Sequence, residues 1–187
     1  MSAEVMLEML APRERVGCKG PAAQSWLASH GIGVPAGANR YEIDSCGVLS
    51  ARLATSEFLL EGTGGAGNAA VTPVKRALES AEHPKGVYPV LRQDFVLEIS
   101  GGQAQQLLLQ TCAVDLEPVA RESSANAGPV IMTSMVGVSV VLACRQLSDG
   151  PRFTVWSDPS YSAYFKHQLL AIAASLAPSI RPGGNQP

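Results

Sequence analysis

The feature that most constrains the fold is a short pattern that occurs twice, 81 residues apart from Gly20 to Gly101. In each copy an apolar segment ends beside a glycine, and residues with apolar side chains at helical spacing follow. The two copies are Lys19–Leu27 and Ser100–Leu108. Apolar residues three and four apart indicate a helix with one buried face. The repeat therefore predicts two strand–helix units.

Each copy continues in the same order, with a hairpin and then a second helix. The hairpin strands show apolar residues at alternate positions or short apolar runs, bounded by turn residues. They are Gly47–Ala54 with Glu57–Glu61 in the first copy, and Val130–Cys144 with Phe153–Trp156 in the second. The second helices are expected to begin at Thr72-Pro73 and at Asp158-Pro159-Ser160, because Thr and Asp cap helices and Pro suits the first turn.

This order predicts an α+β fold built from two ferredoxin-like βαββα modules related by an internal duplication. We assign the first module to residues 1–86, the second to residues 87–180, and a loose Gly/Pro tail to residues 181–187. A sheet covered by helices on one side leaves its other face open. We therefore expect the two modules to pack those faces together in one compact unit with pseudo-twofold character.

Three connecting segments carry weaker signals. Ala3–Leu10 has apolar residues on one side of a helical projection and is expected to be a short helix. Gly62–Asn68 contains four glycines and is expected to be a flexible link. It lacks the Lys-Ser/Thr ending of a nucleotide loop, so we interpret it as a linker. Residues 113–127 are expected to form a loop.

Composition and charge argue against several classes of partner. The net charge of −2 and the pI near 5.9 come without a basic cluster, which argues against nucleic acid. The longest strongly apolar run, Val136–Ala143, is too short to span a bilayer. Residues 1–10 lack the basic segment of a signal peptide, so we expect a cytoplasmic protein. Charged residues make up only 16% of the chain. Either part of the surface is buried against partner proteins, or the source proteome is rich in alanine.

The residues that most often carry chemistry lack the spacing that chemistry requires. No two cysteines form a CxxC pair, and no histidine belongs to an HExxH-type motif, so we predict neither a metal site nor a catalytic residue in this chain. The residues considered are Cys18, Cys46, Cys112, Cys144, His30, His83 and His167.

Two polar residues remain as candidates for cofactor binding. Arg92 belongs to the polar cluster Arg92-Gln93-Asp94 and is suited to a ligand carboxylate, although a surface or interface ion pair with Asp94 is the simpler interpretation. Asp115 is suited to a pterin ring, although an acid at that point also braces turns.

Several stretches resemble the gamma subunit of heterotetrameric sarcosine oxidase, over roughly Arg13 to Leu176. They share order and spacing with that family, although no single motif is decisive. The stretches are Gly20-Pro21 with Trp26-Leu27, Gly86–Val90 with Arg92-Gln93-Asp94, Leu108–Leu116 (LLQTCAVDL), Met135–Val140 (MVGVSV), and Asp158-Pro159-Ser160 with Tyr164.

The resemblance implies an aminomethyltransferase-like fold and a non-catalytic subunit that assembles with alpha, beta and delta subunits. In such complexes FAD, FMN, NAD and tetrahydrofolate belong mainly to the alpha and beta subunits, and zinc belongs to the delta subunit. Relatives of the complex oxidise other N-methylated amino acids, so the amine stays open. The alternatives are a stand-alone tetrahydrofolate-binding aminomethyltransferase-like protein and a homodimeric α+β protein of another function.

Overall fold

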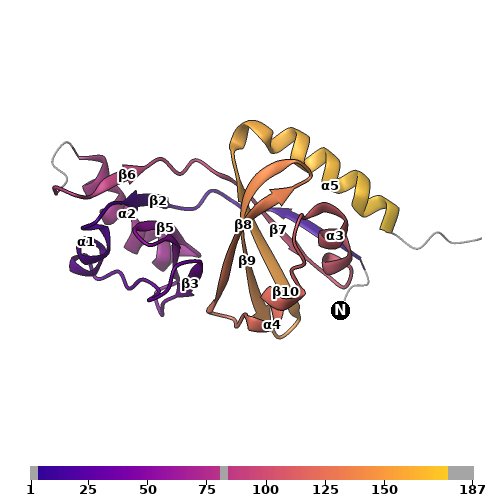
Figure 1. The fold of residues 1–187 in the computed structure, drawn as a ribbon, viewed down its shortest axis with the longest axis horizontal. Coiled ribbons are helices and arrows are strands. Elements are labelled where there is room, and N and C mark those ends of the chain that lie inside the picture. The colour runs from indigo at the N-terminus through magenta and orange to yellow at the C-terminus, as the bar shows by residue number, and fades with distance from the viewer. Residues whose placement is uncertain (1–3, 81–83, 177–187) are drawn as a thin grey trace, which may run out of the picture.

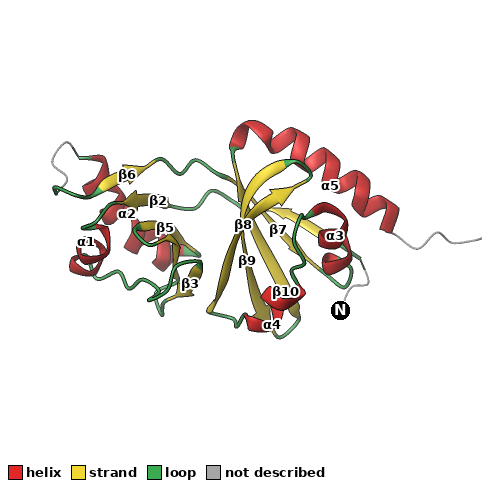
Figure 2. Ribbon diagram, viewed as in Figure 1, coloured by secondary structure: helices red, strands yellow, loops and turns green. Residues whose placement is uncertain are grey.

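The computed structural model of this chain describes residues 4–80 and 84–176 (Figures 1 and 2). Its strands are β1 (Met6–Met9), β2 (Arg15–Lys19), β3 (Arg40–Ile43), β4 (Val48–Ala54), β5 (Glu57–Gly62), β6 (Tyr88–Val90), β7 (Phe95–Ser100), β8 (Ala127–Met135), β9 (Val138–Leu147) and β10 (Gly150–Ser157). Its helices are α1 (Ala23–Ser29), α2 (Gly65–Glu79), α3 (Ala104–Thr111), α4 (Glu117–Glu122), the 3₁₀ turn η1 (Pro159–Tyr161) and α5 (Ser162–Leu176).

All the strands join into one curled antiparallel sheet, in the order β1-β7-β10-β9-β8-β3-β4-β5-β2-β6. The first five positions belong to the second half of the chain apart from β1, and the last five belong to the first half apart from β6. The halves meet where β3 pairs with β8, with Tyr41 opposite Gly128. Figure 1 shows them side by side, each with its own helices.

The two halves exchange their edge strands. β1 leads directly into β2 along the chain but pairs with β7, and β6 leads into β7 but pairs with β2. The repeated glycines lie where the exchanged segments pass: Gly20 and Gly101 have φ of 124° and 97°. A Cβ at Gly20 would lie 2.3 Å from the Gly86 carbonyl oxygen, and one at Gly101 would lie 2.0 Å from that of Glu4. Only glycine tolerates both the positive φ and the lack of space for a Cβ, which explains why the repeat includes it.

Alternating strand residues divide the core into three clusters. On β5, Phe58 and Leu60 face α1 and α2, whereas Leu59 faces the other way. A second cluster lies beneath α3 and α5 and includes Phe153 and Phe165. The third cluster contains residues of both halves and lies on the faces turned away from the helices; it comprises Tyr41, Leu49, Ala51, Leu53, Leu59, Val96, Val130, Ala143 and Trp156. The open faces therefore share a core, as the element order led us to expect.

The predicted helix at Ala3–Leu10 is wrong. Met6 to Met9 form strand β1, which hydrogen-bonds to β7 with Met6 opposite Ser100. The sheet edge supplies partners for this segment, and tertiary pairing overrides its helical spacing. Residue 3 lies outside the described residues.

The predicted flexible link at Gly62–Asn68 is also wrong, because α2 already begins at Gly65. A Cβ at Gly67 would lie 2.2 Å from the Gly47 carbonyl oxygen, so this glycine allows a close approach of helix and loop. Thr72-Pro73 therefore lies inside the helix, where the Thr72 hydroxyl donates to the Asn68 carbonyl at 2.8 Å.

The segment 113–127, predicted as a loop, contains helix α4. Its first turn has Pro118, and the main-chain N–H of Glu117 donates to Asp115 Oδ1 at 2.9 Å. The predicted final helix is present after the η1 turn, which Asp158 caps. The tail at 181–187 lies outside the described residues, and the module boundaries at 86 and 180 stay predictions.

Candidate functional site

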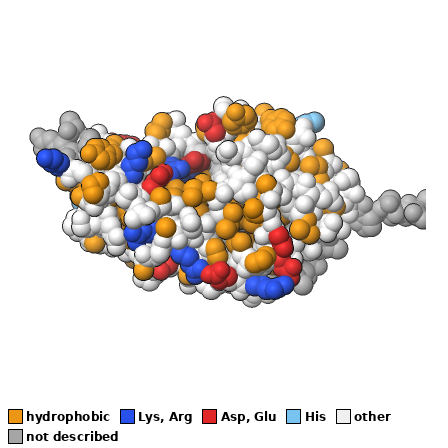
Figure 3. All heavy atoms as spheres, viewed as in Figure 1, with side chains coloured by type: hydrophobic (Ala, Val, Ile, Leu, Met, Phe, Trp, Pro, Cys, Tyr) orange, Lys and Arg blue, Asp and Glu red, His pale blue; other side chains and the backbone are white. Residues whose placement is uncertain are grey.

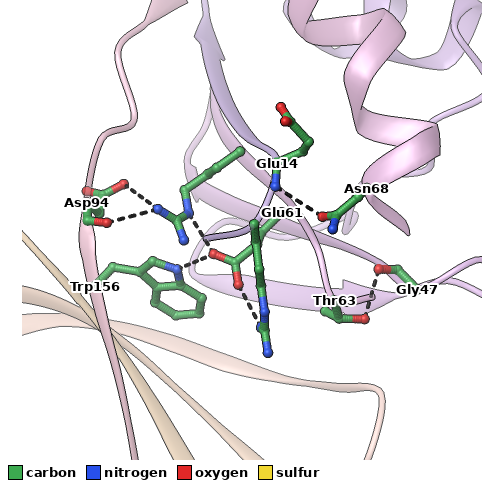
Figure 4. Close-up of polar contacts among 9 residues, drawn as sticks. Glu14, Gly47, Glu61, Thr63, Asn68, Asp94 and Trp156 are labelled. Carbon is green, nitrogen blue, oxygen red and sulfur yellow. Dashed lines mark hydrogen bonds and ion pairs between the residues drawn. The ribbon is translucent and has the colours of Figure 1, made fainter. Parts of the chain in front are cut away.

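A fully buried carboxylate lies where the two halves meet (Figure 4). Glu61, near the end of β5, accepts from Arg13 Nη1 at 2.9 Å through Oε1. Its Oε2 accepts from Arg15 Nε at 2.6 Å and from Trp156 Nε1 at 2.7 Å. Glu61 is 0% exposed and Trp156 is 2% exposed. Because Trp156 belongs to β10 of the second half, this carboxylate joins the two halves through a charge-assisted hydrogen bond.

Asp94, in the segment that connects the halves, extends this polar cluster. Arg15 Nη1 donates to the Asp94 main-chain oxygen at 3.1 Å and lies 4.0 Å from its Oδ2. Arg92 Nη1 lies 4.0 Å from Asp94 Oδ1, and Arg92 Nη2 donates to Glu57 Oε1 at 3.0 Å. Burial raises the pKa of Asp94 above its ordinary value and outweighs the two guanidinium groups, which act to lower it.

The Asp94 concavity, a hollow of about 420 Å³, opens beside this cluster. Its walls include Asp94, Met132, Val141, Trp156, Ser157 and Asp158. Within the described part of the chain, Asp94 Oδ2 and the Ser157 hydroxyl are buried without a hydrogen-bond partner. A buried polar atom without a hydrogen-bond partner costs free energy, so these two groups lower the stability of this part of the fold.

The Arg92 pocket, about 370 Å³, lies on the other side of the cluster, between β2, β6 and α2. Three cations line it, Arg15, Lys75 and Arg92, together with Glu79 and apolar residues such as Leu78. Each cation already has an acidic partner within the chain: Glu61 for Arg15, Glu14 for Lys75, and Glu57 for Arg92. Arg92 Nε is buried and has no partner among the described residues.

The structure does not bring the two predicted candidates together. Arg92 lies in the connecting segment and contacts Glu57, as described above. Asp115 lies between α3 and α4, where it is exposed and its Oδ1 accepts from the main-chain N–H of Glu117 in the turn before α4. It lines a separate hollow of about 100 Å³ with Leu109 and Leu116. This hydrogen bond confirms that Asp115 braces a turn, and its role toward a pterin stays a prediction.

The centre of the site, Glu61 with its partners, was not predictable from the sequence. Glu61 follows an apolar run, and a charged residue at that place indicates the end of a strand. Trp156 lies in an apolar segment and is therefore interpreted as a core residue. The available signal was the alternate spacing of Arg13, just before β2, and Arg15, the first residue of β2, which places both side chains on one side of the strand. Their common partner lies 46 residues or more along the chain from either arginine, so only the folded structure identifies it.

The cysteines and histidines within residues 4–80 and 84–176 take no part in the contacts of this cluster. Burial raises the pKa of the Cys18 thiol to about 12 and that of Cys144 to about 11, so both stay protonated at neutral pH. His30 Nδ1 lies 2.9 Å from the Trp26 carbonyl oxygen at the end of α1, and His83 lies outside the described residues. No group of three or more His, Cys, Asp and Glu residues in the described ranges is arranged to hold a metal ion.

A search of the helices within residues 4–80 and 84–176 finds none long and apolar enough to span a membrane. No protein-family model and no curated protein matches this sequence.

Solved structures give clear matches. One chain of heterotetrameric sarcosine oxidase from Corynebacterium sp. U-96, in complex with pyrrole 2-carboxylate, superposes with a TM-score of 0.67 at 23% identity. The match covers 91% of this chain and 84% of that one. The fold is aminomethyltransferase-like. Glycine cleavage system aminomethyltransferase T from Bartonella henselae matches with a TM-score of 0.60 at 17% identity, over 90% of this chain and 46% of the transferase. The chain thus spans about half of the transferase.

Proposed function

We propose that this chain is the gamma-type, non-catalytic subunit of a heterotetrameric flavin-dependent oxidase of sarcosine or another N-methyl amino acid. The observation that carries the proposal is the extent of the match. The chain covers 84% of a chain from heterotetrameric sarcosine oxidase but only 46% of aminomethyltransferase T. The sarcosine oxidase chain also gives the higher TM-score, 0.67 against 0.60 for the transferase.

The polar centre supports this assignment. Glu61, Arg15 and Arg92 each contact an oppositely charged residue of this chain. Their charges are thereby used to hold the halves and the connecting segment together. A residue that performs acid–base chemistry needs a partner on the reactant. The proposal therefore assigns catalysis, with FAD, FMN, NAD, tetrahydrofolate and zinc, to the alpha, beta and delta subunits in the cytoplasm.

The proposal includes the internal duplication. With the exchanged strands counted, the sheet order is β4-β5-β2-β6 in the first half and β9-β10-β7-β1 in the second. Each half then has a ferredoxin-like arrangement of four strands and two helices, α1 with α2 and α3 with α5. Equivalent turns at Gly20 and Gly101 support an origin of both halves from one module.

Co-expression tests the assembly role. This chain carries an affinity tag and is produced with candidate alpha, beta and delta subunits encoded beside it. We expect one stoichiometric complex that contains flavin and oxidises sarcosine or a related N-methyl amino acid. The isolated chain should bind no flavin. Failure to recover any complex under conditions that fold all four chains would refute the proposal, and cell fractionation of the same strain checks the location.

A second candidate function is binding of tetrahydrofolate by the chain alone. It is favoured by the Arg92 pocket, whose cations and apolar wall suit a ligand with a carboxylate and a flat ring system, and by the unpartnered Arg92 Nε. Titration calorimetry with tetrahydrofolate tests it. Arg92→Ala should weaken binding at least tenfold, whereas Asp115→Ala, in a separate hollow, is the matched control and should leave it unchanged. Absence of binding to the wild-type chain would rule it out.

A further inference from the structure

The two edge strands of the sheet differ in what they offer a partner. β6, at one edge, contains Pro89, which has no main-chain N–H. A proline on an edge strand hinders the addition of a further strand. β1, at the other edge, has the sequence MLEM, with neither proline nor lysine, and is the indigo strand beside β7 in Figure 1. No strand of the described residues pairs with its outer side, so β1 is an open edge.

The hydrogen bonds between β1 and β7 determine which main-chain groups of β1 face outward. The Leu10 N–H donates to the Val96 carbonyl oxygen at 3.2 Å. In an antiparallel pair the bonded residues alternate along each strand, so the even-numbered residues of β1 bond to β7. The N–H and C=O groups of Leu7 and Met9 therefore point away from β7, where no other described strand receives them. An extended chain laid along this edge would bond to both residues.

Glu8 gives this edge a negative charge that the fold does not offset. It is exposed, and its carboxylate has no hydrogen bond or ion pair among residues 4–80 and 84–176. It lies opposite Glu98 of β7, and like charges directly opposite each other are destabilising. Arg152 binds Glu98 at 3.2 Å but also binds Asp149 at 2.8 Å. On the face drawn in Figure 3, Lys and Arg side chains lie mainly over the first half. A cation on the outer side of β1 would offset the charge of Glu8.

The other face of β1 is apolar. Leu7 lies opposite Ile99 and packs against the cluster beneath α3 and α5. Met9 points to the same side, because side chains two apart on a strand share a face, and it is 53% exposed. A further strand would extend this apolar row and cover Met9. Methionine suits such a contact, since its flexible side chain adapts to a partner surface.

We infer that the open edge of β1 receives an extended segment of a partner chain, with a Lys or Arg opposite Glu8 and apolar side chains beside Leu7 and Met9. In strand addition, main-chain hydrogen bonds supply affinity and alternate side chains supply specificity. A second copy of this chain fits less well, because pairing Leu7 with Met9 of the copy sets Glu8 opposite Glu8. The inference rests on the proposed assembly role and names the chemistry by which a partner recognises this chain.

Amide hydrogen exchange in the isolated chain and in the complex tests this pairing. In the isolated chain the Leu7 and Met9 amides should exchange quickly, whereas the Glu8 and Leu10 amides are held by β7 and should exchange more slowly. In the assembled complex the Leu7 and Met9 amides should slow at least about tenfold, as read by mass spectrometry with residue-level fragmentation. Unchanged exchange of both amides in an assembled complex overturns the inference and leaves the assembly role intact.

A methyl group on the Leu7 main-chain nitrogen tests the edge without changing a side chain. The Gly17-Cys18 junction allows a synthetic segment 1–17 to be ligated at Cys18 to the rest of the chain. The methyl group removes an outward donor and leaves the bonds to β7 in place, so it should weaken assembly at least about fivefold. The control is the same ligated chain without the methyl group. Equal affinity of the two folded chains, checked by circular dichroism, contradicts the inference.

Reversal of the Glu8 charge tests for the basic residue on the partner. Glu8→Lys should weaken assembly about fivefold, and Glu8→Gln should weaken it less. The isolated Glu8→Lys chain should remain folded, since its new cation faces Glu98. Glu42→Lys is the matched control, because Glu42 is an exposed acid of β3 with no ion pair among the described residues. Unchanged or tighter assembly of Glu8→Lys rules out a basic residue opposite Glu8.

The remaining outcomes separate this inference from the assembly role. If light scattering shows a dimer of the isolated chain in which the Leu7 and Met9 amides are protected, the occupant is a second copy and the choice of a partner chain is wrong. If the four folded chains form no complex, the assembly role fails and the inference fails with it. A complex that forms with fast exchange at Leu7 and Met9 refutes the inference alone.

Discussion

Removal of the Glu61 carboxylate should be among the most destabilising single changes in this chain. Glu61→Ala leaves the Arg15 guanidinium, whose side chain is 8% exposed, without its main counter-charge. Breaking a buried ion pair in this way costs about 3–5 kcal/mol. The same change removes the acceptor of the Trp156 indole N–H, a loss of about 1–3 kcal/mol that overlaps with the first.

We therefore expect the free energy of unfolding to fall by about 3–5 kcal/mol, a large fraction of the roughly 5–15 kcal/mol that holds a typical protein folded. Urea denaturation followed by far-UV circular dichroism measures this loss as a lower midpoint with an unchanged slope. Tryptophan fluorescence, which reports on Trp26 in the first half and Trp156 in the second, should give the same midpoint if the two halves unfold together.

Two further variants test whether the burial of the ion pair is the cause of this loss of stability. Glu122→Ala removes an ion pair to Arg40 that is largely exposed, so it should change the stability by no more than about 1 kcal/mol. The double replacement Arg15→Met with Glu61→Met removes both charges and should be less destabilising than Glu61→Ala. If the free energy of unfolding of Glu61→Ala lies within about 1 kcal/mol of the wild-type value, the buried carboxylate is not what joins the halves.

Three other predictions concern the backbone, pH dependence and thiols. Gly101→Ala places a Cβ against a main-chain carbonyl at positive φ and should lower stability by about 2 kcal/mol or more, whereas Gly33→Ala, with open space around it, should stay within about 1 kcal/mol in the same urea assay. The folded-state pKa of Asp94 is raised, so the stability that its protonated form contributes is present below the ordinary pKa and is lost as pH rises through the folded-state value. Asp94→Asn should accordingly be more stable than wild type near neutral pH and equal to it near pH 3, as thermal unfolding across pH would show; a constant difference would contradict the assigned cause. A thiol reagent should label exposed Cys46 quickly and buried Cys18 only on unfolding, and loss of the fast phase in Cys46→Ala checks the assignment.

Much of the fold was predictable because it depends on local patterns. The strand–helix units at Lys19–Leu27 and Ser100–Leu108, both hairpins and the final helix follow from apolar spacing and turn residues, which act within a few positions along the chain. The segments that failed were those whose structure depends on distant partners. Met6–Met9 has helical spacing but is a strand because the edge of β7 is free to pair with it. Gly67 looks like part of a flexible link but is helical because it packs on Gly47.

The same distinction between local and distant partners applies to the candidate site. The sequence showed that Arg92-Gln93-Asp94 is a polar cluster between apolar runs, and Arg92 does lie beside a pocket. It could not show that Asp115 braces a turn beside a different hollow, or that Asp94 and Ser157 lie beside one hollow. Side chains separated by 63 residues share a site only through strand pairing, here β10 beside β7 with Ser157 opposite Phe95.

By itself, the sequence determined the low net charge and predicted the order of strands, helices and hairpins in each half, because composition and local periodicity carry that information. The tertiary structure alone decided that the two halves exchange edge strands, that Glu61 joins them through Arg13, Arg15 and Trp156, and that Asp94 and Ser157 lie beside one hollow. Burial and charge pairing between residues remote along the chain depend on how the sheet curls, and no local pattern encodes that.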